Sequence, residues 1–423
     1  MSLKQSMLSV STLMASVAVL LMGNGLLGTL IPVRANLESF SGIDIGILGS
    51  FYFVGFTIGC MTGPGLIARV GHIRTYLAFV AVAAIAALVH VLANDVWVWW
   101  LMRAMTGFSF SVLFIVIESW LNERSDNETR GTVLSIYMVI NLTVLMLGQL
   151  MLTLADPRSF SLFVISAILF LLAALPVAMT QAQSPNPIPT VWPRLMRLYR
   201  VSPVGTVVCF AVGLANGAFW SVGPLFPMDR GFGTPGIAFF MSAVVLGGAI
   251  GQWPLGRLSD TVDRRYVILA SALSAGLSGL ALSYGITDDR ATLAALGFLF
   301  GMFALPLYAL TVAHANDLTN PSDYVETSST LLLLLGIGSS IGPTLSSVLD
   351  SLTNRNELFT YTCAVHILIV CFVAWRTTRR GPITADLKGE FRDALVAAQT
   401  HAPIEDLKAP PTAVEQGETY PAA

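Results

Sequence analysis

The sequence predicts an all-helical integral membrane protein with twelve transmembrane helices in two pseudo-symmetric six-helix bundles. Three observations predict this fold class. The 423-residue chain is 54% hydrophobic, and its mean hydropathy of +0.71 exceeds what the surface of a water-soluble domain tolerates. Apolar runs of about 20 residues, the length that crosses a bilayer as a helix, recur from end to end. The second half of the chain repeats the first.

The apolar runs predict helices because lipid offers the backbone no other hydrogen-bond partner, and the alternating pattern of a β-barrel is absent from the sequence. Clusters of Gly, Pro and charged residues separate the runs. The expected spans are 10–33, 44–68, 75–93, 97–121, 131–154, 160–180, 202–228, 236–256, 266–286, 291–314, 324–350 and 358–376.

These spans divide the chain into four parts. Residues 1–180 are the expected N-terminal bundle, and residues 202–376 the C-terminal bundle. Residues 181–201 contain several prolines and three arginines, which suits a cytoplasmic linker with one short interfacial helix. Residues 377–423 turn polar and then Pro/Ala-rich, so we expect a largely disordered cytoplasmic tail.

The basic residues predict the orientation. Of the 23 Lys and Arg residues, 17 fall on the side that both termini share, five on the opposite side, and one, Arg103, inside a span. Basic residues concentrate in cytoplasmic loops, so both termini should be cytoplasmic.

An internal repeat supports the two-bundle organisation. The stretch "NGLLGTLIP" (Asn24–Pro32) aligns with "NGAFWSVGP" (Asn216–Pro224) at an offset of 192 residues, and the same offset places Gly55 on Gly247. The two copies run in parallel order, which indicates bundles related by an axis along the membrane normal.

Charge gathers in the loop "GRLSDTVDRR" between the eighth and ninth spans. This loop resembles the cytoplasmic signature G-x-L-x-D-x-x-[GD]-R-[RK] of the major facilitator superfamily. The resemblance implies a cytoplasmic gate that stabilises the state closed to the cytoplasm; ordinary helix caps and topology-setting charges are the alternative. The matching residues are Gly256, Leu258, Asp260, Asp263, Arg264 and Arg265.

The equivalent first-half loop, "PGLIARVGHIR", departs from the signature. A proline replaces the glycine and Ala68 replaces the acid, whereas Arg69 and Arg74 remain. We include both arginines in the expected gate, where they could pair with Glu118 or Glu123 at the end of the fourth span.

A closer resemblance covers residues 10–376. The stretches "ESWLNERSDNETRGTVLSIYMV" (118–139) and "LYALTVAHANDLTNPSDYVETSSTLLLL" (307–334) resemble the YcaD-like branch of bacterial facilitator-superfamily transporters. This resemblance implies a multi-pass protein of the bacterial inner membrane.

Two charged residues of the fourth span are candidates for the transport pathway. Arg103 lies about six residues inside the span, where an uncompensated cation is costly, so it either serves function or snorkels to the interface. Glu118 follows 15 residues later, about 60° away on the helical wheel. It either carries protons in the central cavity or pairs with an arginine at the cytoplasmic rim.

Three further residues complete the candidate pathway. Asn24 and Asn216, paired by the repeat, could contact a substrate from the first and seventh spans, or could hydrogen-bond between helices. Arg34, at the outer end of the first span, could attract anions or anchor the helix.

The sequence therefore favours a secondary active transporter that moves a small organic solute by rocking-bundle alternating access, with proton coupling. Uptake of a small anion and efflux of amphipathic compounds both stay open. The alternative is a non-transporting membrane sensor or scaffold that acts through its tail. Neither nucleotide-binding motifs nor metal-ligand spacings occur, so we expect no enzyme, cofactor or metal. The expected partners are a small-molecule solute, protons and the lipid bilayer, without nucleic acid, and we expect a monomer.

Overall fold

The computed structural model describes residues 3–123, 130–179, 193–285, 289–320, 323–353, 355–379, 381, 389, 391 and 394. All regular elements within these residues are helices. They are α1 (Leu3–Leu37), α2 (Gly42–Val70), α3 (His72–Leu92), α4 (Val96–Glu123), α5 (Arg130–Leu150), the 3₁₀ helix η1 (Met151–Leu154), α6 (Ser161–Ala178), α7 (Leu195–Val201), α8 (Pro203–Val222), α9 (Leu225–Asp229), α10 (Thr234–Thr261), α11 (Arg264–Tyr284), α12 (Arg290–Ala304), α13 (Leu307–Asn316), α14 (Tyr324–Thr353) and α15 (Leu358–Thr377).

Twelve stretches within the described residues are long and apolar enough to cross a membrane, which confirms the predicted number of spans. The expected tenth span is broken: α12 ends at Ala304 and α13 begins at Leu307. Pro306 lies between them, and a proline cannot donate the helical hydrogen bond to the preceding turn. The seventh span also ends earlier than expected, at Val222, before Pro224 and the short α9.

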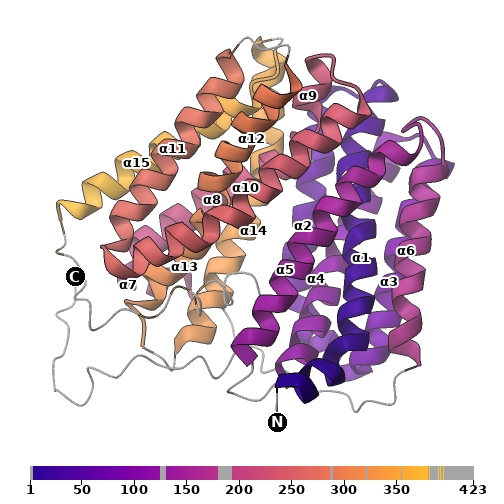
Figure 1. Cartoon of the computed structure of the whole chain (residues 1–423), viewed down its shortest axis with the longest axis horizontal. Coiled ribbons are helices and arrows are strands. Elements are labelled where there is room, and N and C mark those ends of the chain that lie inside the picture. Colours follow the sequence, from indigo (N-terminus) through magenta and orange to yellow (C-terminus); the bar gives the residue numbers. More distant parts are fainter. Residues whose placement is uncertain are drawn as a thin grey trace.

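The same helix pairings occur in both halves of the chain. In the first half α2 packs on α4, α1 on α5, and α3 on α6; in the second half α10 packs on α12, α8 on α14, and α11 on α15. Figure 1 shows α1–α6 and α8–α15 as two groups of helices that lean against each other. The two halves therefore repeat each other in helix packing as well as in sequence.

Four glycines explain why the same close helix pairs occur in both halves. Gly55 and Gly107 lie between α2 and α4, and Gly247 and Gly301 lie between α10 and α12. A Cβ atom on any of them would collide with a backbone carbonyl oxygen of the partner helix. Small residues of this kind let two membrane helices approach closely, because no side chain separates the backbones.

The most extensive contacts between the groups are those of α2 with α14 and of α5 with α10; α2 also contacts α8. The Ser50 and Thr344 hydroxyl oxygens are 2.8 Å apart in a hydrogen bond between α2 and α14. Gly46 and Gly49 press against Pro343 of α14. Successive spans alternate in direction, so α2 begins and α14 ends on the face opposite to the chain termini. We call this the far face, the other the termini face, and these α2–α14 contacts the far-face seam.

Candidate functional site

A cavity of about 280 Å³ lies between the two groups of helices. Its walls come from α1, α2, α4 and α5 of the first half and from α8 and α10 of the second. The lining residues are Asn24, Gly25, Gly28, Thr29, Tyr52, Phe53, Phe56, Arg103, Phe114, Leu145, Gln149, Trp220, Ser221 and Met241. Ser221 also abuts Gly49 of the far-face seam, so the cavity lies against that seam.

Arg103 of α4 provides the positive charge of this cavity. Its guanidinium carbon lies 4.4 Å from the centre of the Tyr52 ring, a cation–π contact that the close packing of α2 on α4 brings about. Arg103 is only 7% exposed, and its Nε has no hydrogen-bond partner. The described residues that line the cavity include no aspartate or glutamate. Among the described lining residues, this cation therefore has no carboxylate beside it.

Two amide side chains add polar atoms to the same cavity. Asn24 of α1 is a hydrogen-bond neighbour of the Tyr52 hydroxyl. Gln149 of α5 is 2% exposed, and its Oε1 has no hydrogen-bond partner. The Gln149 oxygen, an acceptor, and Arg103 Nε, a donor, are therefore free to hydrogen-bond with a bound molecule.

Aromatic rings cover much of the remaining wall. Phe53 and Phe56 come from α2, Phe114 from α4 and Trp220 from α8. Neither these residues nor Tyr52 were among the predicted site residues, because an aromatic residue in an apolar run is as common on a lipid-facing or core surface. Trp220 follows Asn216 in the repeated stretch, which was the one available signal.

The structure does not place all the candidate pathway residues in the cavity. Asn216 is half-buried on α8 and is not among the lining residues. Glu118 is 1% exposed, lies beside Tyr137 of α5, and does not line the cavity either. It follows Arg103 by 15 residues on one helix, which separates them by about 22 Å along the axis.

Arg34 lies at the far-face end of α1 and holds it in place. Its Nη1 donates a hydrogen bond to the Pro157 carbonyl oxygen at 2.9 Å, and its Nη2 lies 2.6 Å from Glu38 Oε1. The bond to Pro157 ties α1 to the loop before α6, in keeping with the anchoring alternative.

The charged loop between α10 and α11 forms a compact cluster on the termini face. Arg264 is 2% exposed; its Nη1 lies 3.0 Å from Asp260 Oδ1, and its Nε lies 2.7 Å from Asp317 Oδ2. Arg265 Nη2 lies 2.6 Å from Asp263 Oδ2. The four charged residues expected in this gate thus pair with one another and with Asp317, which follows α13. All of these residues belong to the second half.

The surroundings of Asp263 act on the pKa of its carboxyl in opposite directions. Burial by itself raises the pKa of the Asp263 carboxyl, but hydrogen bonds and the charge of Arg265 outweigh it and hold this pKa below its ordinary value of 3.8. The carboxylate also caps α11, since it accepts a hydrogen bond from the Arg265 N–H.

The first-half loop has no comparable cluster in the part of the chain that the structure describes. The Arg69 and Arg74 side chains are exposed. The Glu123 side chain, one of their suggested partners, lies outside the described residues.

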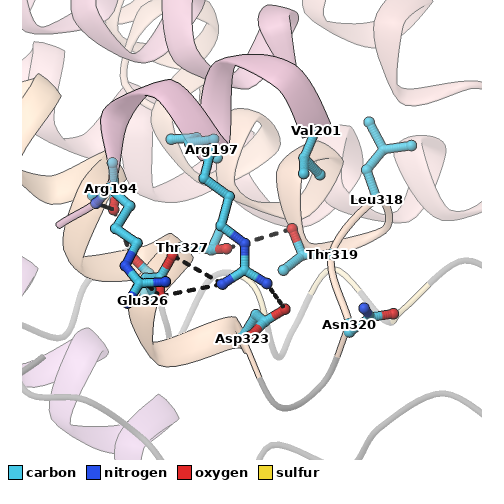
Figure 2. A pocket seen from close by; sticks show the side chains of 11 residues that line it. Arg194, Arg197, Val201, Leu318, Thr319, Asn320, Asp323, Glu326 and Thr327 are labelled. Atoms are coloured by element: carbon cyan, nitrogen blue, oxygen red, sulfur yellow. Dashed lines mark hydrogen bonds and ion pairs between the residues drawn. The ribbon is translucent and has the colours of Figure 1, made fainter. Parts of the chain in front are cut away.

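A second ion-pair group on the termini face ties the linker to α14, as Figure 2 shows. Arg197 of α7 lies 2.6 Å from Asp323 and 3.2 Å from Glu326, and Arg194 lies 3.7 Å from Glu326. Both arginines are half-exposed or more, so each pair contributes little by itself. Together they fix the position of α7 beside the start of α14. Sequence analysis did not anticipate these partners, because the acids lie more than a hundred residues away.

A family model of the major facilitator superfamily matches residues 13–238 and 205–413, which together span most of the sequence. The chain belongs to the major facilitator superfamily. This confirms the resemblance inferred from the charged loop. It also confirms that the chain is a transporter-family protein and not an enzyme.

Curated relatives from this superfamily are bacterial. The uncharacterized MFS-type transporter YcaD of Escherichia coli is 27% identical over 364 residues, which cover 85% of this chain and 93% of YcaD. An MFS-type transporter of Yersinia pestis is 27% identical over 337 residues, covering 79% and 86%. The chain is therefore a multi-pass, MFS-type membrane transporter with YcaD among its relatives.

Solved facilitator-superfamily structures share the fold. A mutant of the nucleoside transporter NupG superposes with a TM-score of 0.74 at 13% identity, over 86% of this chain and 99% of NupG. A bacterial homologue of the human lysosomal transporter Spinster, in an inward-facing and occupied conformation, gives a TM-score of 0.68 at 15% identity, over 93% and 95%. Identities this low establish the fold alone.

Proposed function

We propose that this transporter moves a small aromatic or amphipathic carboxylate through the central cavity, by alternating access of two rocking six-helix bundles. The 17-to-5 division of basic residues supports a bacterial inner-membrane orientation with the termini face in the cytoplasm. A monomer is the unit of transport in this proposal.

The observation that carries the substrate class is the buried charge of Arg103. At the centre of a membrane helix an arginine costs about 2.5–3.5 kcal/mol even on insertion scales, and Arg103 is buried several residues inside α4. No carboxylate of the described residues lining the cavity offsets this cost. A substrate carboxylate would supply the missing charge and accept hydrogen bonds from the guanidinium, whose planar geometry matches it. Asn24 and Gln149 would orient its polar groups.

The rest of the cavity supports an aromatic or apolar body for the same substrate. Rings from both halves line it, and aromatic pairs stabilise one another beyond the area that they bury. Its volume of about 280 Å³ lies near the lower end of the range of about 300–1,000 Å³ for small-molecule pockets. A single-ring carboxylate is therefore a better fit than a large drug-like compound.

Glu118 is the proposed proton carrier. It is buried on the helix that carries Arg103, but outside the cavity. Coupling would therefore act through movement of α4, because direct competition between proton and substrate for one site does not fit the separation of about 22 Å.

Ligand binding to the purified protein tests the substrate class. Thermal unfolding is measured with benzoate, with its neutral amide benzamide, and with uridine as a representative of the class that NupG's name states. Ligands that bind the folded state raise its apparent melting temperature by mass action. We expect benzoate alone to do so, and we expect Arg103→Gln to abolish the shift. The matched control is Arg158→Gln, which removes an exposed arginine on the far face and should leave the shift intact. Equal shifts with benzamide, or an unchanged shift in Arg103→Gln, would reject the carboxylate.

Transport in proteoliposomes tests the coupling. Glu118→Gln should lose pH-gradient-driven accumulation of benzoate and keep benzoate exchange, since exchange needs no net proton movement. Gradient-driven accumulation at the wild-type level would remove Glu118 from the mechanism.

A further inference from the structure

A small pocket lies on the termini face, where four helices of the second half begin or end. The helices are α8 and α11, which begin there, and α13 and α15, which end there. The residues around the pocket include three basic ones, Arg265, His314 and Arg376, and three apolar ones, Pro203, Val204 and Leu318. None of its described lining residues is acidic. This termini-face pocket therefore brings basic side chains from three helices together.

Arg376, in the last turn of α15, is the cation of this pocket that lacks an ion-pair partner. Arg265 is paired with Asp263, and the other acid nearby, Asp317, also has an arginine partner. Within the part of the chain that the structure describes, no carboxylate pairs with Arg376. Its guanidinium carbon instead lies 5.7 Å from the centre of the Trp375 ring. An anion in the pocket would therefore neutralise the charge of Arg376.

The outer surface of α15 leads to this pocket. Leu368 is 67% exposed, Trp375 is 50% exposed, and Cys371 between them is exposed as well. Their spacing of three and four residues places them on one face of the helix. Figure 1 shows α15 at the edge of the second group of helices, where lipid tails would cover this apolar face. Tryptophan lies at the level of the lipid headgroups, so lipid phosphates would lie beside Arg376.

We propose that the termini-face pocket binds the phosphate of an anionic phospholipid whose acyl chains lie along α15. Basic pockets between membrane helices bind anionic headgroups on the cytoplasmic side, where the proposed orientation puts the termini face. A guanidinium group matches phosphate oxygens in geometry and charge. The pocket has a volume of about 20 Å³, room for about one water-sized group such as a phosphate oxygen. The rest of the headgroup lies at the membrane surface.

A soluble phosphate compound would share the contact with Arg376 but would leave the apolar face of α15 unused. The exposed face beside the pocket therefore favours a lipid as the source of the phosphate. The proposal uses the proposed orientation, but neither the proposed solute nor the proton coupling.

Arg376 also has two ordinary explanations, which call for a matched control. A basic residue in the last turn of a helix interacts favourably with the helix dipole, and arginines in general mark the cytoplasmic ends of spans. Arg379 lies just beyond the same helix, and its guanidinium carbon is 6.0 Å from the centre of the same Trp375 ring. It does not line the pocket. Arg379→Gln therefore removes a neighbouring charge and leaves the pocket unchanged.

Binding to the purified full-length protein tests the site. Thermal unfolding in detergent is measured with phosphatidylglycerol, with zwitterionic phosphatidylcholine, and with glycerophosphate, which carries the phosphate without acyl chains. Ligands that bind the folded state raise its apparent melting temperature. We expect phosphatidylglycerol alone to do so. Arg376→Gln should raise the phosphatidylglycerol concentration for the half-maximal shift about tenfold, the scale of one lost charge-assisted hydrogen bond. Arg379→Gln should change it far less.

Native mass spectrometry of the same samples gives a second readout, because it counts the lipids that stay bound. Phosphatidylglycerol should remain on the wild type and on Arg379→Gln at concentrations at which Arg376→Gln has lost it. Equal losses in the two variants would overturn the site, since they would show a diffuse attraction to the basic end of α15.

The other two ligands test the kind of molecule. An equal, Arg376-dependent shift with glycerophosphate would overturn the lipid and assign the pocket to a soluble phosphate compound. An equal shift with phosphatidylcholine would overturn the requirement for an anionic headgroup. None of these measurements involves transport, so a failure of the carboxylate proposal would leave the test of this site intact.

Discussion

At the scale of single residues, the burial of the Arg103 cation is costly in stability, and this cost is the reason for its proposed role in binding. It is buried beside Tyr52, and its Nε lacks a hydrogen-bond partner. An arginine that only stabilises the fold would be expected to find hydrogen-bond acceptors for its guanidinium within the protein. Arg34 is the contrast, because its guanidinium contacts both the Pro157 carbonyl and Glu38.

This contrast leads to a prediction about stability. Arg103→Met should raise the apparent melting temperature of the ligand-free protein by a few degrees, because it removes a buried cation that costs about 2.5–3.5 kcal/mol. The same change should abolish the benzoate-induced shift. Arg34→Met, the matched control, should lower the melting temperature, because it breaks contacts between α1 and the loop before α6. A lower melting temperature for Arg103→Met would show that this arginine is structural. Thermal unfolding in one detergent reports all of these changes.

Asp263 gives a prediction that depends on pH. A carboxyl whose pKa is lower in the folded than in the unfolded state stabilises the fold above the unfolded value of about 3.8, and the contribution disappears as the pH falls through the folded value. Asp263→Asn keeps a helix-capping side chain but loses the charge facing Arg265. It should destabilise the protein by about 1.5–3 kcal/mol at pH 7. This deficit should shrink below about pH 3.8 in thermal unfolding measured from pH 3 to pH 7. A deficit that stays constant with pH would assign the effect to shape and not to charge.

At the scale of helices, the repeat predicts which glycines are irreplaceable. Gly55→Ala pushes a methyl group into the carbonyl of Ala104 on α4, and such overpacking costs about 1–3 kcal/mol. Gly247→Ala should cost a similar amount in the second half. Gly65 belongs to the same helix as Gly55 but faces open space, so Gly65→Ala should instead stabilise by about 0.5–1 kcal/mol. Thermal unfolding of the three variants tests this order, and equal effects of Gly55→Ala and Gly65→Ala would contradict it.

The spans could be predicted from the sequence because each is a local property of one apolar run. The interruption of the tenth span at Pro306 was missed, because apolar residues continue on both sides of the proline and hydropathy does not register the lost hydrogen bond. Close helix pairs were partly predictable, since Gly55 and Gly247 occupy matching positions in the repeat.

The candidate site was predictable only where a residue conflicts with its surroundings. Arg103 is conspicuous as a cation in an apolar run, and Asn24 as a repeated amide. Tyr52 and Trp220 are not, since an aromatic ring suits a cavity, a helix interface and lipid equally well. The contact of Phe391 with Gly256 was missed for a further reason: the sequence around Phe391 has no periodicity, so a single apolar residue in it gives no signal of what it packs on.

At the scale of the whole molecule, contacts between the two halves concentrate near the far face. The far-face seam joins α2 to α14 through small residues and the Ser50–Thr344 hydrogen bond. Interfaces with small residues and few polar contacts can separate and re-form at low cost, since they leave few buried polar groups without partners. The cavity lies against this seam, so its opening would give the site access to the far face.

The last prediction is that the far-face seam must open for transport to occur. Ser50→Cys combined with Thr344→Cys places two thiols where hydroxyl oxygens now lie 2.8 Å apart, on helices of different halves. Oxidation should link α2 to α14 and stop benzoate transport in proteoliposomes, and reduction should restore it. A control pair is Ser283→Cys with Thr360→Cys, whose hydroxyl oxygens are 3.0 Å apart on α11 and α15 of the same half. A link within one rigid bundle does not oppose rocking, so this pair should transport equally well oxidised and reduced. If the oxidised Ser50–Thr344 pair also transported at full rate, the two halves would not separate at this seam, and the solute would have to reach the far face by another route.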